Sequence, residues 1–254
     1  MFNFHCIVEY DGTNFNGWGK QPGLRTVQDE IETALGKVFN DRPNIICAGR
    51  TDKGVHACGQ SISFKITKEN SKIWEQQLKN DANKLTLRLN ALLPQDIAIK
   101  SIQTVKNSFD ARKSAKSKTY EYIIYNSPQR SPLNKNSSWH ISNPIDINKI
   151  NEIAKFLQTK RDYSVFDSYN SIFDYKIVNL QCVKALKRGK FIKISITGDR
   201  FLYKMIRKIA GEMVRIGKNE KNPETFKQAV LTKNKAAIGK PAPACGLYLT
   251  KVKY

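Results

Sequence analysis

The chain has 254 residues, enough to bury the core of one large domain or of two small ones. With 40% hydrophobic and 26% charged residues, its composition is that of an ordinary soluble globular protein. No apolar run approaches the roughly 20 residues that a membrane-spanning helix needs. The first ten residues alternate like a strand and lack the basic-then-apolar pattern of a signal peptide. Composition therefore argues against a membrane protein.

The charge balance is unusual. Lys and Arg number 43 against 22 Asp and Glu, which gives a formal net charge of +21. A field of this sign attracts polyanions, and phosphate backbones are the commonest polyanions in a cell. A genomic bias toward lysine would explain the lysines but not the scarcity of acidic residues, and an anionic membrane surface is the weaker competitor. The charge favours a nucleic-acid partner.

Cysteine and histidine are used in a way that argues against a metal site. The chain has five dispersed cysteines and no C-x-x-C pair: Cys6, Cys47, Cys58, Cys182 and Cys245. His56 stands two residues before Cys58, but a zinc deaminase would need a Glu two residues after the His and a later P-C-x-x-C. We expect reduced thiols in a cytoplasmic protein and no bound metal.

In the first half of the chain, strands and helices alternate. Residues 2–10 alternate as a strand does, and Thr26 is predicted to cap a helix whose apolar residues recur at helical spacing as far as Val38. The other predicted elements are strands at 44–48 and 58–66, a helix around 71–89 and a strand near 96–105.

The second half repeats this content. Residues 120–125, with the sequence YEYIIY, are strongly strand-like because they are β-branched and aromatic. The other predicted elements are a helix at 146–158, a hairpin of strands 176–187 and 190–197, a helix at 202–216, a helix from Pro223 and a last strand at 246–254, with a polar loop at 126–137. The pattern predicts an α+β fold built from two α/β halves, residues 1–105 and 106–254.

The polar loop between the strands predicted at 44–48 and 58–66 contains the most informative residues. It includes Asp52, flanked by Arg50 and Lys53, in the string AGRTDKGVHA at 48–57. For an isolated Asp in such a loop, a plain turn in which the side chain bonds nearby amides is the simpler interpretation. Here the two neighbouring cations would keep the carboxylate ionised, and so available as a nucleophile or a base.

With this string, the chain resembles the bacterial tRNA pseudouridine synthase A family over nearly its whole length. The matching segments, in order, are EYDG at 9–12, GW at 17–18, TVQ at 26–28, AGRTD at 48–52, VH at 55–56, N-x-x-x-P at 90–94, FDAR at 109–112, Y-x-Y at 120–122, MIR at 205–207 and GLYL at 246–249. Two departures stand out. Gly19 replaces a usual Gln, and residues 159–163 (TKRDY) replace a usual Gly-x-His-Asp-Phe.

The resemblance implies the pseudouridine synthase fold, with a mostly antiparallel central sheet flanked by helices and a basic cleft between the two halves. It implies isomerisation of uridine to pseudouridine at positions 38–40 of the tRNA anticodon stem-loop by a cytoplasmic homodimer. The reaction involves no net oxidation and no second substrate, so no cofactor is expected.

The resemblance also implies roles for individual residues. Asp52 is the expected catalytic nucleophile, with attack on the sugar, attack on the uracil ring and partial proton abstraction all left open. Arg50 would fill the gap left by a flipped nucleotide, or equally form a structural ion pair. Tyr120 would stack on uracil and assist proton transfer, against the alternative of a core aromatic residue. Arg207 would pair with Asp52, against a solvated charge on a helix face.

Two further expectations concern substrate binding. Leu247 would support the target base, although a buried strand leucine is an equally good account. A basic run of Arg112, Lys113, Lys116 and Lys118 would contact phosphates, against the alternative of a solvated charged face. A non-catalytic RNA-binding protein is the competing class, and a pseudouridine synthase with another RNA target is a second competitor. The Arg50-Thr51-Asp52 string argues against the first, because binding polyanions gives no reason to place a carboxylate there.

Overall fold

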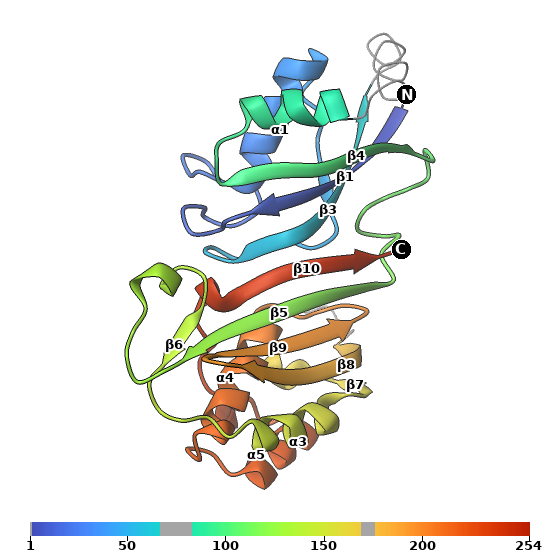
Figure 1. Ribbon diagram of the computed structural model, residues 1–254. Coiled ribbons are helices and arrows are strands. Elements are labelled where there is room, and N and C mark those ends of the chain that lie inside the picture. The colour runs from blue at the N-terminus through green and yellow to red at the C-terminus, as the bar shows by residue number, and fades with distance from the viewer. Residues whose placement is uncertain (1, 67–82, 169–175) are drawn as a thin grey trace. The chain divides into compact units, whose positions relative to one another are not determined.

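The computed structural model describes residues 2–66, 83–168 and 176–254 and divides the chain into two compact units (Figure 1). The first unit comprises residues up to Lys116 together with Leu249–Tyr254, and the second comprises Ser117–Tyr248. The last strand of the chain therefore begins in the second unit and ends in the first. Each unit is described by itself below.

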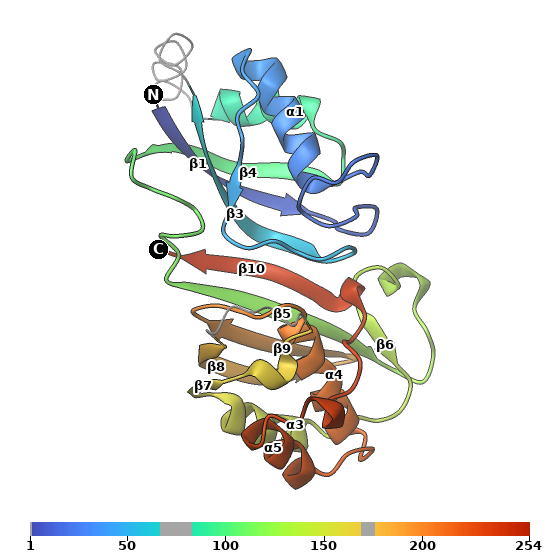
Figure 2. The same ribbon diagram turned by 180° about the vertical axis from the view of Figure 1, so that it is seen from behind.

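The first unit is built on three long antiparallel strands. These are β1 (Phe2–Tyr10), β3 (His56–Ile66) and β4 (Ile97–Val105), in the order β4-β1-β3, with the short β2 (Ile46–Cys47) also paired with β3. Helix α1 (Val27–Phe39) lies across one face of these strands (Figure 2), and residues 83–92 form a further helix.

The core of this unit forms where alternate strand residues meet α1. Phe4 lies opposite Phe64 in the β1–β3 register, and their ring centroids are 5.3 Å apart. Phe39, at the end of α1, lies 5.7 Å from Phe4 and 5.8 Å from Phe64. All three side chains are fully buried, as alternation along β1 and helical spacing along α1 require.

A buried carboxylate on α1, that of Glu32, holds the backbone directly before β2. Glu32 is fully buried and accepts hydrogen bonds from Lys20 at 2.7 Å, Gln28 at 2.8 Å and the backbone N–H of Ile45 at 3.1 Å. A buried charge is tolerated only when it is paired and hydrogen-bonded in this way. The contact with Ile45 positions the chain directly before β2, and hence before the loop that contains Asp52.

In the described residues of the second unit, four strands pair antiparallel. The helices of this unit lie on one face of these strands (Figures 1 and 2). Its strand order is β5-β9-β8-β7, with β6 parallel to β5. The elements are β5 (Ser117–Asn126), β6 (Trp139–Ile141), α3 (Ile147–Leu157), β7 (Lys160–Asp162), β8 (Ile177–Arg188), β9 (Phe191–Gly198), α4 (Met205–Gly217), α5 (Pro223–Leu231) and the start of β10 (Leu247–Lys253). The described residues of this unit also form short 3-10 turns at Pro132–Asn134, Ser164–Phe166, Lys235–Ala237 and Ala244–Gly246.

The predicted α+β fold with a mostly antiparallel sheet is confirmed. Several details differ from the expectation. The strand predicted at 44–48 shrinks to the two residues of β2, and α4 begins at Met205 because Lys204 takes a left-handed conformation. Part of the helix predicted around 71–89 lies outside the described residues. Among the helices of the described ranges, none is long and apolar enough to cross a membrane.

The predicted cap of α1 is half right. Thr26 occupies the N-cap position with extended backbone, but its side chain makes no capping hydrogen bond. Its hydroxyl is buried and has no hydrogen-bond partner among the described residues. The helix start is held instead by backbone bonds, in which the N–H groups of Val27 and Gln28 donate to the carbonyls of Gly17 and Trp18.

Candidate active site

Asp52 lies in the loop between β2 and β3, half-buried between the exposed side chains of Arg50 and Lys53. The loop turns back immediately after Asp52. The N–H of Val55 donates to the carbonyl of Asp52 at 3.1 Å, and Gly54 between them has φ +77°, a conformation that favours glycine. The loop therefore holds a carboxylate within reach of solvent, on a backbone fixed by a tight turn.

The base of this loop is hydrogen-bonded to side chains from β1 and β3. The Tyr10 hydroxyl lies 2.7 Å from Thr51 Oγ1, and the Gln60 amide donates to the Gly49 carbonyl at 2.7 Å. Burial raises the pKa of Tyr10 well above its usual range, so the hydroxyl stays neutral and able to donate at any physiological pH. The residues on the N-terminal side of Asp52 are thus held by buried polar contacts.

A second loop, residues 11–18, packs directly against the Asp52 loop. A Cβ placed on Gly12 would lie 2.0 Å from the carbonyl oxygen of Val55, so only glycine fits there. Gly17 has φ +95°, and a Cβ on it would lie 3.0 Å from the carbonyl oxygen of Thr51. The N–H of Trp18 donates to that same carbonyl at 3.0 Å. Close backbone approach explains why these two glycines occur here.

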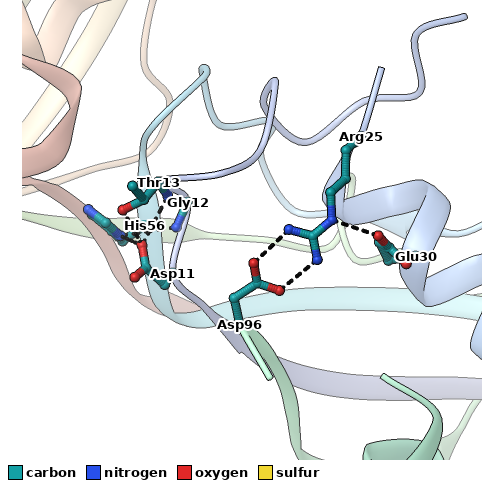
Figure 3. A network of polar contacts seen from close by, with 7 residues as sticks. All are labelled: Asp11, Gly12, Thr13, Arg25, Glu30, His56 and Asp96. Carbon is teal, nitrogen blue, oxygen red and sulfur yellow. Dashed lines mark hydrogen bonds and ion pairs between the residues drawn. The ribbon is translucent and has the colours of Figure 1, made fainter. Parts of the chain in front are cut away.

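A polar network joins the two loops (Figure 3). Nδ1 of His56 lies 3.0 Å from both the N–H of Gly12 and Oδ1 of Asp11. Partial burial opposes ionisation of Asp11, but hydrogen bonds from the Thr13 hydroxyl and N–H, with a smaller contribution from His56, outweigh it and lower the pKa of Asp11. His56 therefore has a structural place beside the loop.

Arg25, which lies between the second loop and α1, pairs with two carboxylates and was not singled out in the sequence (Figure 3). Its guanidinium makes two hydrogen bonds to Asp96, at 2.7 and 2.9 Å, and a third to Glu30 at 2.8 Å. It also lies 4.2 Å from the ring centroid of Phe15. Bidentate pairing with a carboxylate is the strong mode for arginine. In a chain this rich in cations, no local signal distinguishes Arg25 from its neighbours.

The second unit contains three of the expected site residues. Tyr120 is buried in β5, with its ring edge-on to Phe201 at 5.2 Å. Arg207 is half-buried in the first turn of α4, where its Nε donates to the carbonyl of Ala242 at 2.8 Å. Leu247 is buried at the start of β10. Asp52 and Arg50, by contrast, belong to the first unit.

Tyr122, two residues after Tyr120 on β5, packs in the core of the second unit. Its side chain is fully buried, and its hydroxyl donates to the carbonyl of Pro243 at 2.8 Å. Burial raises the pKa of Tyr122 well above its usual range. A ring held in this way packs the core and keeps its proton.

Most of the basic run lies on an irregular segment between β4 and β5. Arg112, Lys113 and Lys116 are exposed, whereas Lys118 is half-buried in β5. The N–H groups of Arg112 and Lys113 both donate to Oδ1 of Asp110 at 2.8 Å. An Asp side chain that accepts from the next residues of its own turn is a common way to fix a loop. The exposed cations therefore stand on an ordered backbone.

The structure accommodates both departures from the family pattern. A Cβ on Gly19 would lie 3.9 Å from Nε of Arg50, so the missing side chain leaves space beside that exposed guanidinium. Arg161 stacks its guanidinium 4.4 Å from the ring centroid of Phe156. The Tyr163 hydroxyl donates to the carbonyl of Leu157 at 2.5 Å. The 159–163 changes thus make contacts within the second unit.

Among the residues that the structure describes, no group of three or more His, Cys, Asp and Glu side chains could hold a metal ion. Buried carboxylates are paired with cations instead. Glu32 pairs with Lys20, Glu212 with Arg215 and Lys221, and Asp167 with Lys176.

Comparison with known proteins is consistent with this geometry. The model of the tRNA pseudouridine synthase family matches residues 6–112 and 154–254, which include the Asp52 loop and the helix that contains Arg207. The chain therefore belongs to the tRNA pseudouridine synthase family, as the resemblance in its sequence predicted, and is an isomerase.

Two curated relatives support the same conclusion. The tRNA pseudouridine synthase A of Acetivibrio thermocellus is 37% identical over 254 residues, which covers 100% of both chains. The tRNA pseudouridine synthase A of Francisella tularensis subsp. novicida is 35% identical over 255 residues, which covers 100% of this chain and 95% of the relative.

Proposed function

We propose that this chain isomerises uridine to pseudouridine at positions 38–40 of the tRNA anticodon stem-loop, with Asp52 as the catalytic nucleophile. The observation that carries the proposal is the Asp52 loop itself. A half-exposed carboxylate stands between two exposed cations, Arg50 and Lys53, on a backbone held by Gly12, Gly17 and the turn at Gly54. Catalytic groups work best when their own positions are fixed in advance.

The proposed reaction can be carried out by a carboxylate without a cofactor. The bond between C1′ of the ribose and N1 of uracil breaks, and a bond between C1′ and C5 forms. The proton on C5 leaves to solvent, and N1 gains a proton, so no electrons are gained or lost overall. A carboxylate serves either as nucleophile or as the base that removes a proton. No cofactor enters this balance, and we propose that none is bound.

The other site residues receive supporting roles in the proposal. Arg50 is exposed beside Asp52, as a side chain that occupies the place of a flipped nucleotide has to be. Tyr120 offers a ring and a hydroxyl, and Arg207 a guanidinium, as further catalytic groups. Leu247 offers an apolar contact to the base. We also propose a homodimer in the cytoplasm, where tRNA is found.

Site mapping tests the proposed target. The purified chain is incubated with unmodified tRNA transcripts, pseudouridine is labelled chemically, and reverse-transcription stops locate the label. We expect stops at positions 38–40 only, and none in a matched transcript with cytidine at those positions. Stops elsewhere in the tRNA would show a synthase with another target, and a chain that binds tRNA without any stop would be a non-catalytic RNA-binding protein.

The basic run gives a prediction about binding. Replacing Arg112, Lys113, Lys116 and Lys118 together by Ala should weaken tRNA binding and flatten its salt dependence, because each phosphate contact releases counterions. Loss of four contacts lowers the slope of log K against log salt by about three to four. The modified nucleotide should stay the same, since phosphate contacts carry no sequence information. The measurement is tRNA affinity at several salt concentrations, with site mapping.

The β8–β9 hairpin supplies a control of equal charge. Its four exposed cations are Lys184, Lys187, Arg188 and Lys190. Replacing these by Ala lowers the net charge by the same amount, and we expect a much smaller change in slope. Equal slopes for the two variants would mean that only the total charge matters and that the basic run is not a specific phosphate contact.

A further inference from the structure

The segment that presents the basic run has no regular secondary structure, yet its backbone is tied down along its length. Residues 106–116 contain neither helix nor strand. The Asn3 amide donates to the carbonyls of Lys106 at 3.0 Å and Phe109 at 2.7 Å. At the other end, the N–H of Lys116 donates to the carbonyl of Lys253 at 2.8 Å. The first unit therefore holds this segment as a preformed surface.

The peptide groups on either side of Ala111 are held most tightly. Its N–H donates to Oγ of Ser63 at 3.0 Å, and its carbonyl accepts from the hydroxyl of Tyr254 at 3.0 Å. The Tyr254 ring packs 4.8 Å from Phe109 and 5.5 Å from His5, measured between centroids. Ala111 is fully buried, and the next residue is the exposed Arg112. Tyr254 thus fixes the point from which the basic run starts.

A chain of buried and partly buried hydrogen bonds leads to the Tyr254 hydroxyl. This hydroxyl also contacts Oγ of Ser61, which lies 2.7 Å from Nε2 of His5, and the Gln103 amide lies 3.2 Å from Nδ1 of His5. The Tyr254 hydroxyl has one proton and donates it to the Ala111 carbonyl, so it must accept a hydrogen bond from the Ser61 hydroxyl. The Ser61 proton is then used, and Oγ of Ser61 accepts from Nε2 of His5. The donors run from Gln103 through His5 and Ser61 to Tyr254.

This direction rules out another interpretation of the same residues. A Ser hydroxyl 2.7 Å from a His resembles a nucleophile with its base. Here the Ser61 proton points to Tyr254 and not to His5, and Ser61 is fully buried. Burial lowers the pKa of His5 and raises that of Tyr254 to about 12, so both groups stay neutral near pH 7. The chain of bonds is structural and keeps the Tyr254 hydroxyl aimed at Ala111.

We propose that Tyr254 is a positioning residue for tRNA binding, which pre-orders Arg112 and Lys113 through the carbonyl of Ala111. The inference rests on the proposed function, in which these cations contact tRNA phosphates. A cation that already stands in its binding position loses less conformational freedom when the RNA arrives, and this increases affinity. Because the Tyr254 hydroxyl orders groups that contact tRNA on binding, it affects tRNA affinity and not the rate of the catalytic step.

The test is Tyr254→Phe, which removes the hydroxyl and keeps the ring. We expect the Kd and the KM for tRNA to rise about 3- to 10-fold, the size of one lost hydrogen bond, with kcat unchanged. The slope of affinity against salt should also stay the same, because the number of phosphate contacts does not change. Tyr163→Phe removes a hydroxyl of the second unit that also donates to a backbone carbonyl, and it should leave the Kd and the KM at wild-type values.

A double-mutant cycle separates positioning from general destabilisation. In a chain with Arg112→Ala and Lys113→Ala, adding Tyr254→Phe should not weaken binding further, because the cations that it positions are gone. An equal loss in both backgrounds, or an unchanged Kd in the single variant, would overturn the proposal. Ser63→Ala, which frees the other side of Ala111, should repeat the effect if Tyr254→Phe folds poorly. Binding is measured without turnover, so a failure of the proposed reaction would be seen separately, as an absence of pseudouridine.

Discussion

Asp52→Asn is expected to lower the rate of pseudouridine formation by at least about 1,000-fold, while tRNA affinity stays close to wild type. The amide has the size of the carboxylate but neither its charge nor its basicity. Affinity should survive because most of it comes from phosphate contacts and not from one carboxylate. The measurements are single-turnover rates on a tRNA transcript and direct binding of the same transcript.

Asp41→Asn is a matched control, since Asp41 is also a half-buried Asp of the first unit and lies in the bend after α1. It should retain wild-type rate and affinity. A near wild-type rate in Asp52→Asn would remove Asp52 from the mechanism. Loss of binding together with rate would instead assign Asp52 to recognition of tRNA.

Gly12→Ala is expected to damage both stability and activity. A Cβ at this position would lie 2.0 Å from the carbonyl oxygen and 2.5 Å from the carbonyl carbon of Val55, and neither atom is the end of a flexible side chain. Inserting a methyl group into a packed site costs about 1–3 kcal/mol, and a backbone neighbour puts the cost at or above the top of that range. The strained residue is Val55, three residues after Asp52, so kcat should also decrease. Chemical denaturation and turnover measure the two effects.

Gly36→Ala makes the same chemical change inside α1. A Cβ there would meet Arg42 at an ordinary 3.5 Å, and an Ala in a helix is favoured over a Gly by roughly 0.5–1 kcal/mol. This control should be as stable as wild type or slightly more stable, with full activity. If Gly12→Ala behaved in the same way, the close packing of the two loops would be of no consequence for the site.

The regular elements were accessible from sequence because their signals are local. Alternation along residues 2–10 and helical spacing after Thr26 predicted β1 and α1 closely. The three-residue strands β6 and β7 were missed, since a run that short shows no period. The return of the last strand to the first unit was also missed, because nothing within 246–254 indicates which strands it joins.

For the candidate site too, the local features were predicted from sequence and the long-range contacts were not. The string around Asp52 is contiguous and was found directly. The contacts that hold it come from distant positions: Gly12 meets Val55, and the Tyr254 hydroxyl reaches Ala111 across 143 positions of sequence. The sequence of α1 alone also does not reveal that Glu32 is buried. Its position on α1 suggests a solvated acid, but Lys20 and the N–H of Ile45 bury it.

The most direct measurement of the central claim is the release of tritium from tRNA that contains uridine labelled at C5. Forming the bond from C1′ to C5 must expel the label to water, and no binding event alone can do so. We predict that the purified wild-type chain releases one equivalent for each target uridine, and that Asp52→Asn releases almost none in the same time. A folded wild-type chain that binds tRNA but releases no tritium would contradict the account.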